Sequence, residues 1–132
     1  MPEREFYSDV TATQLLEWKA YTTTQTSAAV TCDTNMVAFL IGLGLWTAGT
    51  ADFKLTECDT SGGSYTDVAA ADVDGTVPQM ASTATDQADF IVRYTGSKGY
   101  VKLVATLATS PNMIFGASVL KGAPKKTPGA IV

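Results

Sequence analysis

The sequence predicts an all-β protein, an antiparallel β-sandwich or jelly roll with an extended arm at each end. Two observations support this fold class. Apolar and polar residues alternate over several short runs, and turn-forming residues recur at intervals of roughly ten residues. The 132 residues also suffice for one domain of ordinary size. We divide the chain into an N-terminal arm at 1–24, a sandwich domain at 25–122 and an extended C-terminal tail at 123–132.

The N-terminal arm is polar, with scattered aromatic and aliphatic residues. It contains the one good helix candidate, at 13–20. There Leu15, Leu16 and Lys19 are spaced three to four residues apart behind a threonine cap, which is the pattern of one helical face. The arm is therefore expected to carry a short helix of one or two turns.

Strand predictions begin after the arm. Residues 36–41 are apolar on both faces, which predicts a central strand covered by a second layer. The runs at 53–58, 90–95 and 101–107 alternate between apolar and polar, so one face of each can be buried. Further short strands complete a set of about eight, in a pattern typical of sandwiches; they fall at 28–31, 65–69, 77–80 and 114–120.

The inward positions of these runs form the predicted core, which consists of Phe39, Ile41, Phe53, Leu55, Phe90, Val92, Val101 and Leu103. Three segments rich in Gly, Asp and Ser separate the strands, at 59–64, 72–75 and 95–99. Gly supplies positive φ angles in such segments, and Asp or Ser caps the turn. The first and third are predicted to be hairpin connections.

The charge balance excludes several function classes. Nine Lys and Arg residues against 13 Asp and Glu give a net charge of −4, and no basic run exceeds Lys125-Lys126. Nucleic-acid binding and polybasic membrane anchoring both need clustered positive charge. Histidine is absent, which removes the commonest general base and metal ligand. With no secretory signal recognised, we expect Cys32 and Cys58 to be reduced.

No motif predicts a metal, a cofactor or a catalytic residue. Asp72, Asp74 and Gly75 resemble the start of a calcium loop, but the further oxygen ligands and the closing Glu are missing. A turn with side-chain caps is the favoured interpretation. The glycines at 42–44 and 96–99 lack the spacing of a dinucleotide or phosphate-binding loop.

Aromatic residues leave one binding function open. Trp18, Trp46, Tyr65, Tyr94 and Tyr100 could line a sugar-binding platform. Core or cross-strand packing explains Tyr94 and Tyr100 equally well. A small carbohydrate-binding sandwich therefore remains an alternative to a structural role.

Several stretches resemble small virion proteins of tailed bacteriophages. Residues 51–59 and 65–75 are similar to the pattern "F-x-L-x-E-S-D-D" followed by "F-T-D-V-x-x-x-D-L-x-G". Residues 94–102 are similar to "Y-x-G-S-K-R-Y-V-R", and residues 116–124 to "A-V-V-V-R-G-x-P". Cys58 stands where the pattern often has Ser. Gly99 replaces an Arg, so a salt bridge from that position would be missing here.

The virion proteins that the chain resembles look like the head decoration or cement proteins of tailed bacteriophages. The resemblance implies a non-enzymatic structural protein, without cofactor, that binds the outside of a capsid shell and stabilises it. Its partners would be the major capsid protein and further copies of the chain. It would be made in the host bacterial cytoplasm and end on the virion exterior. A tail- or fibre-associated β module is a further alternative, since it would share the fold.

The two ends of the chain supply the candidate shell contacts. The tail combines prolines, which lower the cost of ordering, with a basic pair that could meet an acidic strip and an apolar end that could be buried. A frayed, solvated tail is the alternative. The residues proposed to contact the shell are Trp18, Tyr21, Pro124, Lys125, Lys126 and Ile131.

Overall fold

A computed structural model of the chain describes residues 11–33, 36–82 and 87–122. These residues form an all-β fold with one nine-stranded sheet in which every pairing is antiparallel. The predicted fold class is confirmed. The described residues contain one 3-10 turn, η1 (Ala70–Asp72), and no helix long and apolar enough to cross a membrane.

Two strands dominate the sheet. β4 (Val37–Cys58) and β9 (Tyr100–Lys121) each have 22 residues. They pair with each other along their whole length, from Val37 opposite Lys121 to Cys58 opposite Tyr100. The other strands are β1 (Thr11–Tyr21), β2 (Gln25–Thr26), β3 (Val30–Thr31), β5 (Thr66–Asp67), β6 (Val73–Asp74), β7 (Gln79–Met80) and β8 (Ala88–Tyr94).

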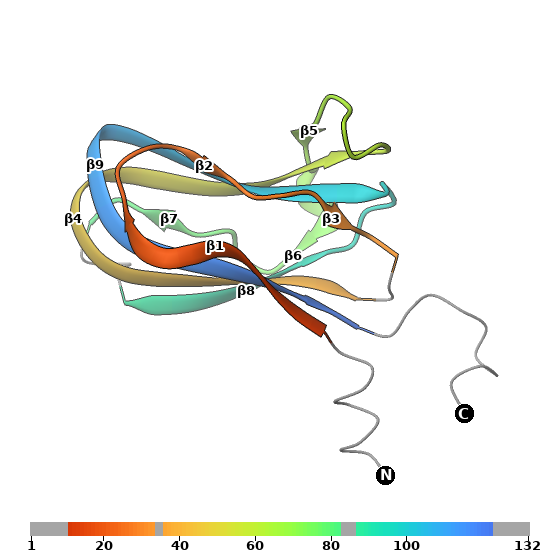
Figure 1. Ribbon diagram of the computed structural model, residues 1–132, viewed down its shortest axis with the longest axis horizontal. Helices are drawn as coiled ribbons and strands as arrows, with labels where there is room; N and C mark the ends of the chain where they lie inside the picture. The colour runs from red at the N-terminus through yellow and green to blue at the C-terminus, as the bar shows by residue number, and fades with distance from the viewer. Residues whose placement is uncertain (1–10, 34–35, 83–86, 123–132) are drawn as a thin grey trace, which may run out of the picture.

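The single sheet makes two layers because β4 and β9 bend over together (Figure 1). The first layer contains β1, the second half of β9, the first half of β4, β8 and β6. The second layer contains β2, β3, the first half of β9, the second half of β4, β5 and β7. The pairing register shifts between Leu43 and Thr50, which marks the bend.

Glycine is required at this bend. Gly49 has φ +80°, and a side chain there would collide with the backbone of Pro111 on β9. Thr109 and Ser110, on the facing part of β9, also have positive φ angles, of 65° and 51°. The two long strands therefore turn at the same place, and each contributes one half to each layer.

The core fills the space between the layers. Of the eight predicted core residues, seven are buried and Phe90 is half-buried against them. Phe115 links the layers, since its ring stacks on Tyr21 at 4.5 Å in the first layer and meets Phe53 edge-on at 5.1 Å in the second. The alternation in the sequence thus identified the core correctly.

The helix predicted at 13–20 is wrong, because these residues belong to β1. Pairing with β9 runs from Thr11 opposite Lys121 to Tyr21 opposite Met113 and buries Leu16 and Tyr21. Such tertiary pairing overrides the weak local preference for helix. The N-terminal arm is therefore wrong over 11–21, where the sheet has already begun. Residues 1–10 and the predicted tail at 123–132 lie outside the described residues.

Of the two predicted hairpins, one is confirmed and the other is wrong. The turn at 59–64 is a hairpin connection as predicted, because β5 pairs back onto β4 with Thr56 opposite Asp67. The segment 95–99 is not a hairpin, because β8 and β9 do not pair with each other there. β8 pairs with the first half of β4 and the start of β9 with its second half, so this segment crosses between the layers. Cys32 and Cys58 are not joined to each other by a disulfide.

Candidate functional site

The outer surface of the first layer is the main candidate site, and we call it the Trp18 face. Alternation fixes most of the outward side chains, because Phe39, Ile41 and Phe115 point into the core. Trp18 and Leu45 lie at register shifts and are placed by their exposure and by the groove that both line. The face is drawn from β1, β4, β8 and β9. It consists of Trp18, Leu40, Gly42, Gly44, Leu45, Asp89, Ile91, Ile114 and Gly116.

Trp18 lies directly on glycines of the sheet. A Cβ added to Gly42 would be 3.1 Å from Trp18 Cζ3, and one added to Gly44 would be 2.9 Å from Trp18 Cζ2. A Cβ on Gly116, which is paired with Gly42, would be 3.1 Å from Trp18 Cα. Only glycine leaves room for the indole to lie against the strands. The side chain is still 55% exposed, so the side turned away from the sheet is open.

The Trp18 face concentrates the exposed apolar surface of the described residues. Their large exposed hydrophobic side chains are Trp18, Leu45 at 56% and Ile91 at 63%, all on this face. Ile91 is directly opposite Leu40 in the register of β8 and β4. Exposed apolar side chains that gather on one face mark an interaction site more often than scattered ones do.

Two shallow grooves flank Trp18. One, of about 410 Å³, is lined by Leu45, Ile114 and Gln87 together with Trp18. The other, of about 240 Å³, lies on the side of Gln14, Leu40 and Ser118. Trp18 and Asp89 line both grooves, so these two side chains mark the centre of the face.

Asp89 is the one acidic residue of the Trp18 face. A Cβ on Gly42 would be 3.2 Å from Asp89 Oδ1 as well as 3.1 Å from Trp18, so carboxylate and indole border the same space. Within 11–33, 36–82 and 87–122, Asp89 has no ion-pair partner and Trp18 Nε1 no hydrogen-bond acceptor. The other tryptophan differs, because Trp46 Nε1 donates to the Gly49 carbonyl at 2.8 Å.

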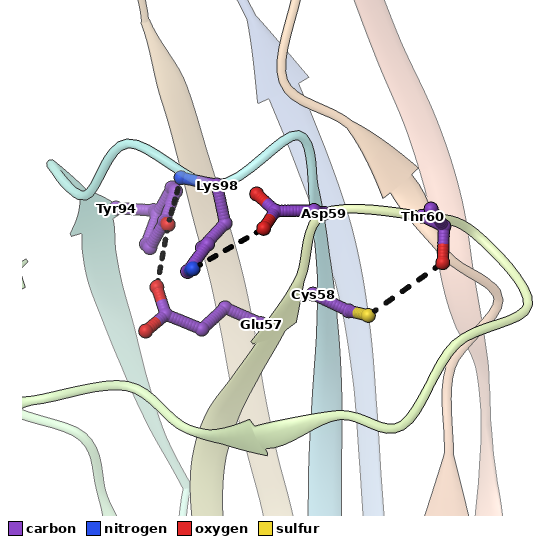
Figure 2. Close-up of polar contacts among 6 residues, drawn as sticks. All are labelled: Glu57, Cys58, Asp59, Thr60, Tyr94 and Lys98. Carbon is purple, nitrogen blue, oxygen red and sulfur yellow. Dashed lines mark hydrogen bonds and ion pairs between the residues drawn. The ribbon is translucent and has the colours of Figure 1, made fainter.

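A cluster of polar side chains lies where the segment 95–99 crosses between the layers, and we call it the Tyr94 cluster (Figure 2). The Tyr94 hydroxyl donates to Glu57 Oε1 at 2.7 Å and accepts a hydrogen bond from the Lys98 backbone N–H at 3.0 Å. Lys98 Nζ is 3.3 Å from Asp59 Oδ2. These four residues join the end of β4 to the crossing segment.

The Tyr94 cluster is suited to holding the crossing rather than to catalysis. Burial, followed by the hydrogen bond to Glu57, raises the pKa of the Tyr94 hydroxyl well above its usual value. The hydroxyl therefore stays protonated near neutral pH, where it keeps both hydrogen bonds. A side chain on Gly96 would collide with the Tyr94 hydroxyl, so glycine is needed beside it.

The acidic segment at 72–75 is only in part the predicted turn, because Val73 and Asp74 form the short strand β6 between η1 and Gly75. Asp72 ends η1, and its carbonyl accepts the Thr95 N–H at 2.8 Å. Asp74, on β6, lies 3.9 Å from Arg93 Nη2. In the part of the chain that the structure describes, no group of three or more Cys, Asp and Glu side chains could hold a metal ion.

The five aromatic residues considered for a sugar platform do not all come together. Trp18 lies on the outer face of the first layer, while Tyr94 is buried and Trp46 is half-buried at the bend. Tyr65 belongs to the opposite side of the molecule, where Lys102 Nζ lies 4.3 Å from its ring centroid. Trp18, Trp46 and Tyr94 therefore do not share one platform with Tyr65, whereas Tyr100 lies close enough to Tyr65 to interact with it electrostatically.

The structure places the predicted contact residues in different environments. Trp18 is exposed at the centre of the face, but Tyr21 is wrong as a surface contact because its ring is buried against Phe115. Its hydroxyl donates to the Glu17 carbonyl at 2.6 Å. The tail residues Pro124, Lys125, Lys126 and Ile131 lie outside the described residues.

The partners of Trp18 were not among the predicted site residues. The glycines at 42–44 were considered as a phosphate-binding loop and rejected, and Asp89 was not a candidate. The available signal was their spacing of two, which puts both glycines on one face of a strand. A glycine at such a position indicates close approach of another group.

Comparisons with known proteins add little to this description. No protein-family model matches the sequence, and a search of curated proteins finds no match. A solved structure with some similarity contains the CBM22-1-GH10 modules of the Clostridium thermocellum N-terminal endo-1,4-beta-D-xylanase 10B, complexed with xylohexaose. The TM-score is 0.39 at 11% identity, covering 70% of this chain and 17% of that chain. The account therefore rests on the fold and the Trp18 face.

Proposed function

We propose that the chain is a non-enzymatic structural virion protein, a decoration or cement protein that binds the outside of a bacteriophage capsid shell and stabilises it. The observation that carries the proposal is the Trp18 face. The large exposed apolar side chains of the described residues all lie there, on one outer face of the sandwich. Such a patch is suited to docking on another protein.

The Trp18 face has the properties of a docking surface. Its central residues lie on paired strands, so little order has to be created on binding and the entropic cost is low. Trp18 offers a large flat ring, and tryptophan is prominent among residues that dominate binding energy in interfaces. Leu45 and Ile91 add apolar surface around it.

The phage resemblance supports the same proposal from the sequence. Several of its residues hold the fold together, among them Tyr94 and Lys98 in the Tyr94 cluster. The resemblance thus describes a scaffold, on which the Trp18 face would supply the contact to the major capsid protein. Many weak contacts repeated over a shell can add up to strong stabilisation through effective concentration.

The location of the protein tests the proposal. Virions of the phage that encodes the chain would be separated into heads and tails, and each fraction probed for the protein. We expect it on the head exterior, and we expect heads that lack it to assemble but to lose DNA at a lower temperature. Detection only on tails would favour the tail-module alternative, and absence from virions would overturn the proposal.

A pair of matched variants tests the face itself. Trp18→Ala should weaken binding to shells at least tenfold, equivalent to about 1.4 kcal/mol per site. Lys54→Ala, on the opposite outer face, should bind as the unmodified protein does, since Lys54 belongs to a charged and solvated surface. Equal effects of the two substitutions would remove the Trp18 face from the contact.

A further inference from the structure

We infer that the Trp18 face recognises a protein segment in which an arginine is flanked by apolar residues, its guanidinium stacking on Trp18 and pairing with Asp89. The inference rests on the proposed function only in taking the shell protein as the source of this segment. It starts from the juxtaposition of the indole and the carboxylate above Gly42.

Charge complementarity is the first argument. Four other carboxylates of the described residues lie in ion pairs, among them Asp67, 3.0 Å from Lys54, and Asp33, 2.7 Å from Lys121. Asp89 is exposed on an apolar surface and has no cationic partner among the residues that the structure describes. A partner that covered this face without supplying a cation would bury an uncompensated charge, which is costly.

The ring next to Asp89 selects the kind of cation. The guanidinium of arginine is planar, stacks on aromatic rings and carries a fork of donors that matches a carboxylate. Lysine offers a compact, strongly hydrated charge that fits a flat ring less well. Trp18 presents an open side, and Asp89 lines both grooves beside the ring together with Trp18, so one planar cation can contact both.

The surroundings favour a peptide over a sugar. Leu45, which lines a groove with Trp18, is 56% exposed, and Ile91, opposite Leu40 on the same face, is 63% exposed. Sugar hydroxyls placed over such side chains would lose water without gaining hydrogen bonds. Apolar side chains on either side of an arginine would instead fill the two grooves, which meet at Trp18 and Asp89.

The test uses the two tryptophans as a built-in comparison. The full chain would be titrated with acetyl-Leu-Arg-Leu-amide while the indole N–H signals of Trp18 and Trp46 are followed by NMR, assigned with Trp18→Phe. We expect a saturable shift of the Trp18 signal only, because Trp46 Nε1 is already bonded to Gly49. Asp89→Asn should weaken the response about tenfold, whereas Asp52→Asn, on the other outer face, should leave it unchanged.

Three further probes define the chemistry. Replacing the peptide arginine by lysine should weaken binding several-fold, and replacing it by uncharged citrulline should weaken it more. An unbranched β-1,4-linked hexasaccharide should cause no saturable shift. Equal binding of the arginine, lysine and citrulline peptides, saturable binding of the sugar, or no shift of Trp18 with any peptide would each overturn the inference.

Shell binding by the same variants separates this inference from the proposed function. If Asp89→Asn loses the peptide response but Trp18→Ala and Asp89→Asn still bind shells normally, arginine recognition stands and the capsid role of the face fails. If Trp18→Ala abolishes shell binding while the peptides show no preference for arginine, the capsid role stands and the arginine inference fails.

Discussion

The two outer faces of the sandwich are built by the same two strands and yet differ in chemistry. Outward positions on the first half of β4 carry Leu40, Gly42 and Gly44, beneath and beside Trp18. The corresponding surface of the second layer is polar, and we call it the Lys54 face; it consists of Asp52, Lys54, Tyr65, Asp67 and Lys102. There Lys54 pairs with Asp67 at 3.0 Å and Lys102 covers the Tyr65 ring.

The difference separates the residues that folding explains from those that it does not explain. Inward positions are equally apolar in both layers, as Phe39 and Ile41 in the first half of β4 and Phe53 and Leu55 in the second all show. Folding therefore accounts for the inner faces of both layers alike. It does not require apolar side chains outside, so the Trp18 face needs another explanation, and docking supplies one.

Removing the Phe115 ring, which packs between the layers, should destabilise both layers. Phe115→Ala takes away a fully buried ring that contacts Tyr21 and Phe53, and the expected loss is about 3–5 kcal/mol of unfolding free energy. Urea unfolding measures it. Ile91→Ala, at an exposed position of the Trp18 face, is the control and should change stability by less than about 0.5 kcal/mol. Similar losses for both would contradict the assignment of core and face.

Loosening the Tyr94 cluster should destabilise the crossing between the layers. Tyr94→Phe leaves Glu57 and the Lys98 N–H without their hydrogen-bond partner, at a cost of roughly 1–3 kcal/mol near neutral pH. Thr66→Val, on the exposed strand β5 of the second layer, is a control expected to have little effect. An unchanged unfolding free energy for Tyr94→Phe would mean that the cluster does not hold the crossing.

The same tyrosine predicts a pH dependence. Burial raises its pKa in the folded state above the unfolded value of about 10, so its contribution is fully present below that pH. As the pH rises further, the unfolded state loses the proton first and stability falls. Tyr94→Phe should therefore lose less stability between neutral pH and pH 11 than the unmodified protein. Parallel pH profiles would contradict the assignment.

Disturbing the glycines beneath Trp18 should have a smaller effect. Gly44→Ala adds a Cβ 2.9 Å from both Trp18 Cζ2 and Ile114 Cγ2, so these side chains must move. We expect a loss of about 1 kcal/mol and a changed Trp fluorescence spectrum. Gly62→Ala is the matched control, because nothing lies within 4 Å of its added Cβ. A spectrum identical to that of the control would mean that Trp18 does not lie on the glycines.

The Lys54 face should be the least sensitive region. Lys54→Ala removes an exposed ion pair with Asp67, and such pairs contribute about 0–1 kcal/mol. High salt should reduce even this effect. A loss of several kcal/mol, measured by urea unfolding at low salt, would show that the face does more than meet solvent.

The sequence predicts local features of this fold well. Alternation identified inward residues such as Leu55, Val101 and Leu103, because the period of two is set by the strand itself. The pairing of strands that are far apart in the sequence could not be predicted. β1 was mistaken for a helix at 13–20 because its strand character comes from β9, nearly a hundred residues away. The 95–99 crossing was mistaken for a hairpin for the same reason.

Local sequence patterns also could not predict the length of the strands or the position of the site. The runs at 36–41 and 53–58 are parts of one bent strand, whose bend depends on register shifts against β9. The Trp18 face arises because that pairing puts Gly42 opposite Gly116 and brings Trp18 over both. Trp18 itself could be singled out as a contact residue, but its neighbours could not.

Hydroxyl-radical footprinting of the protein, free and bound to capsid shells, tests the central claim most directly. Trp18 and Tyr65 both react readily with hydroxyl radicals and lie on opposite outer faces, so each chain reports on both surfaces at once. We predict that oxidation of Trp18 falls at least fivefold on shells while that of Tyr65 is unchanged. Protection of Tyr65 with continued oxidation of Trp18 would contradict the assignment of the docking surface.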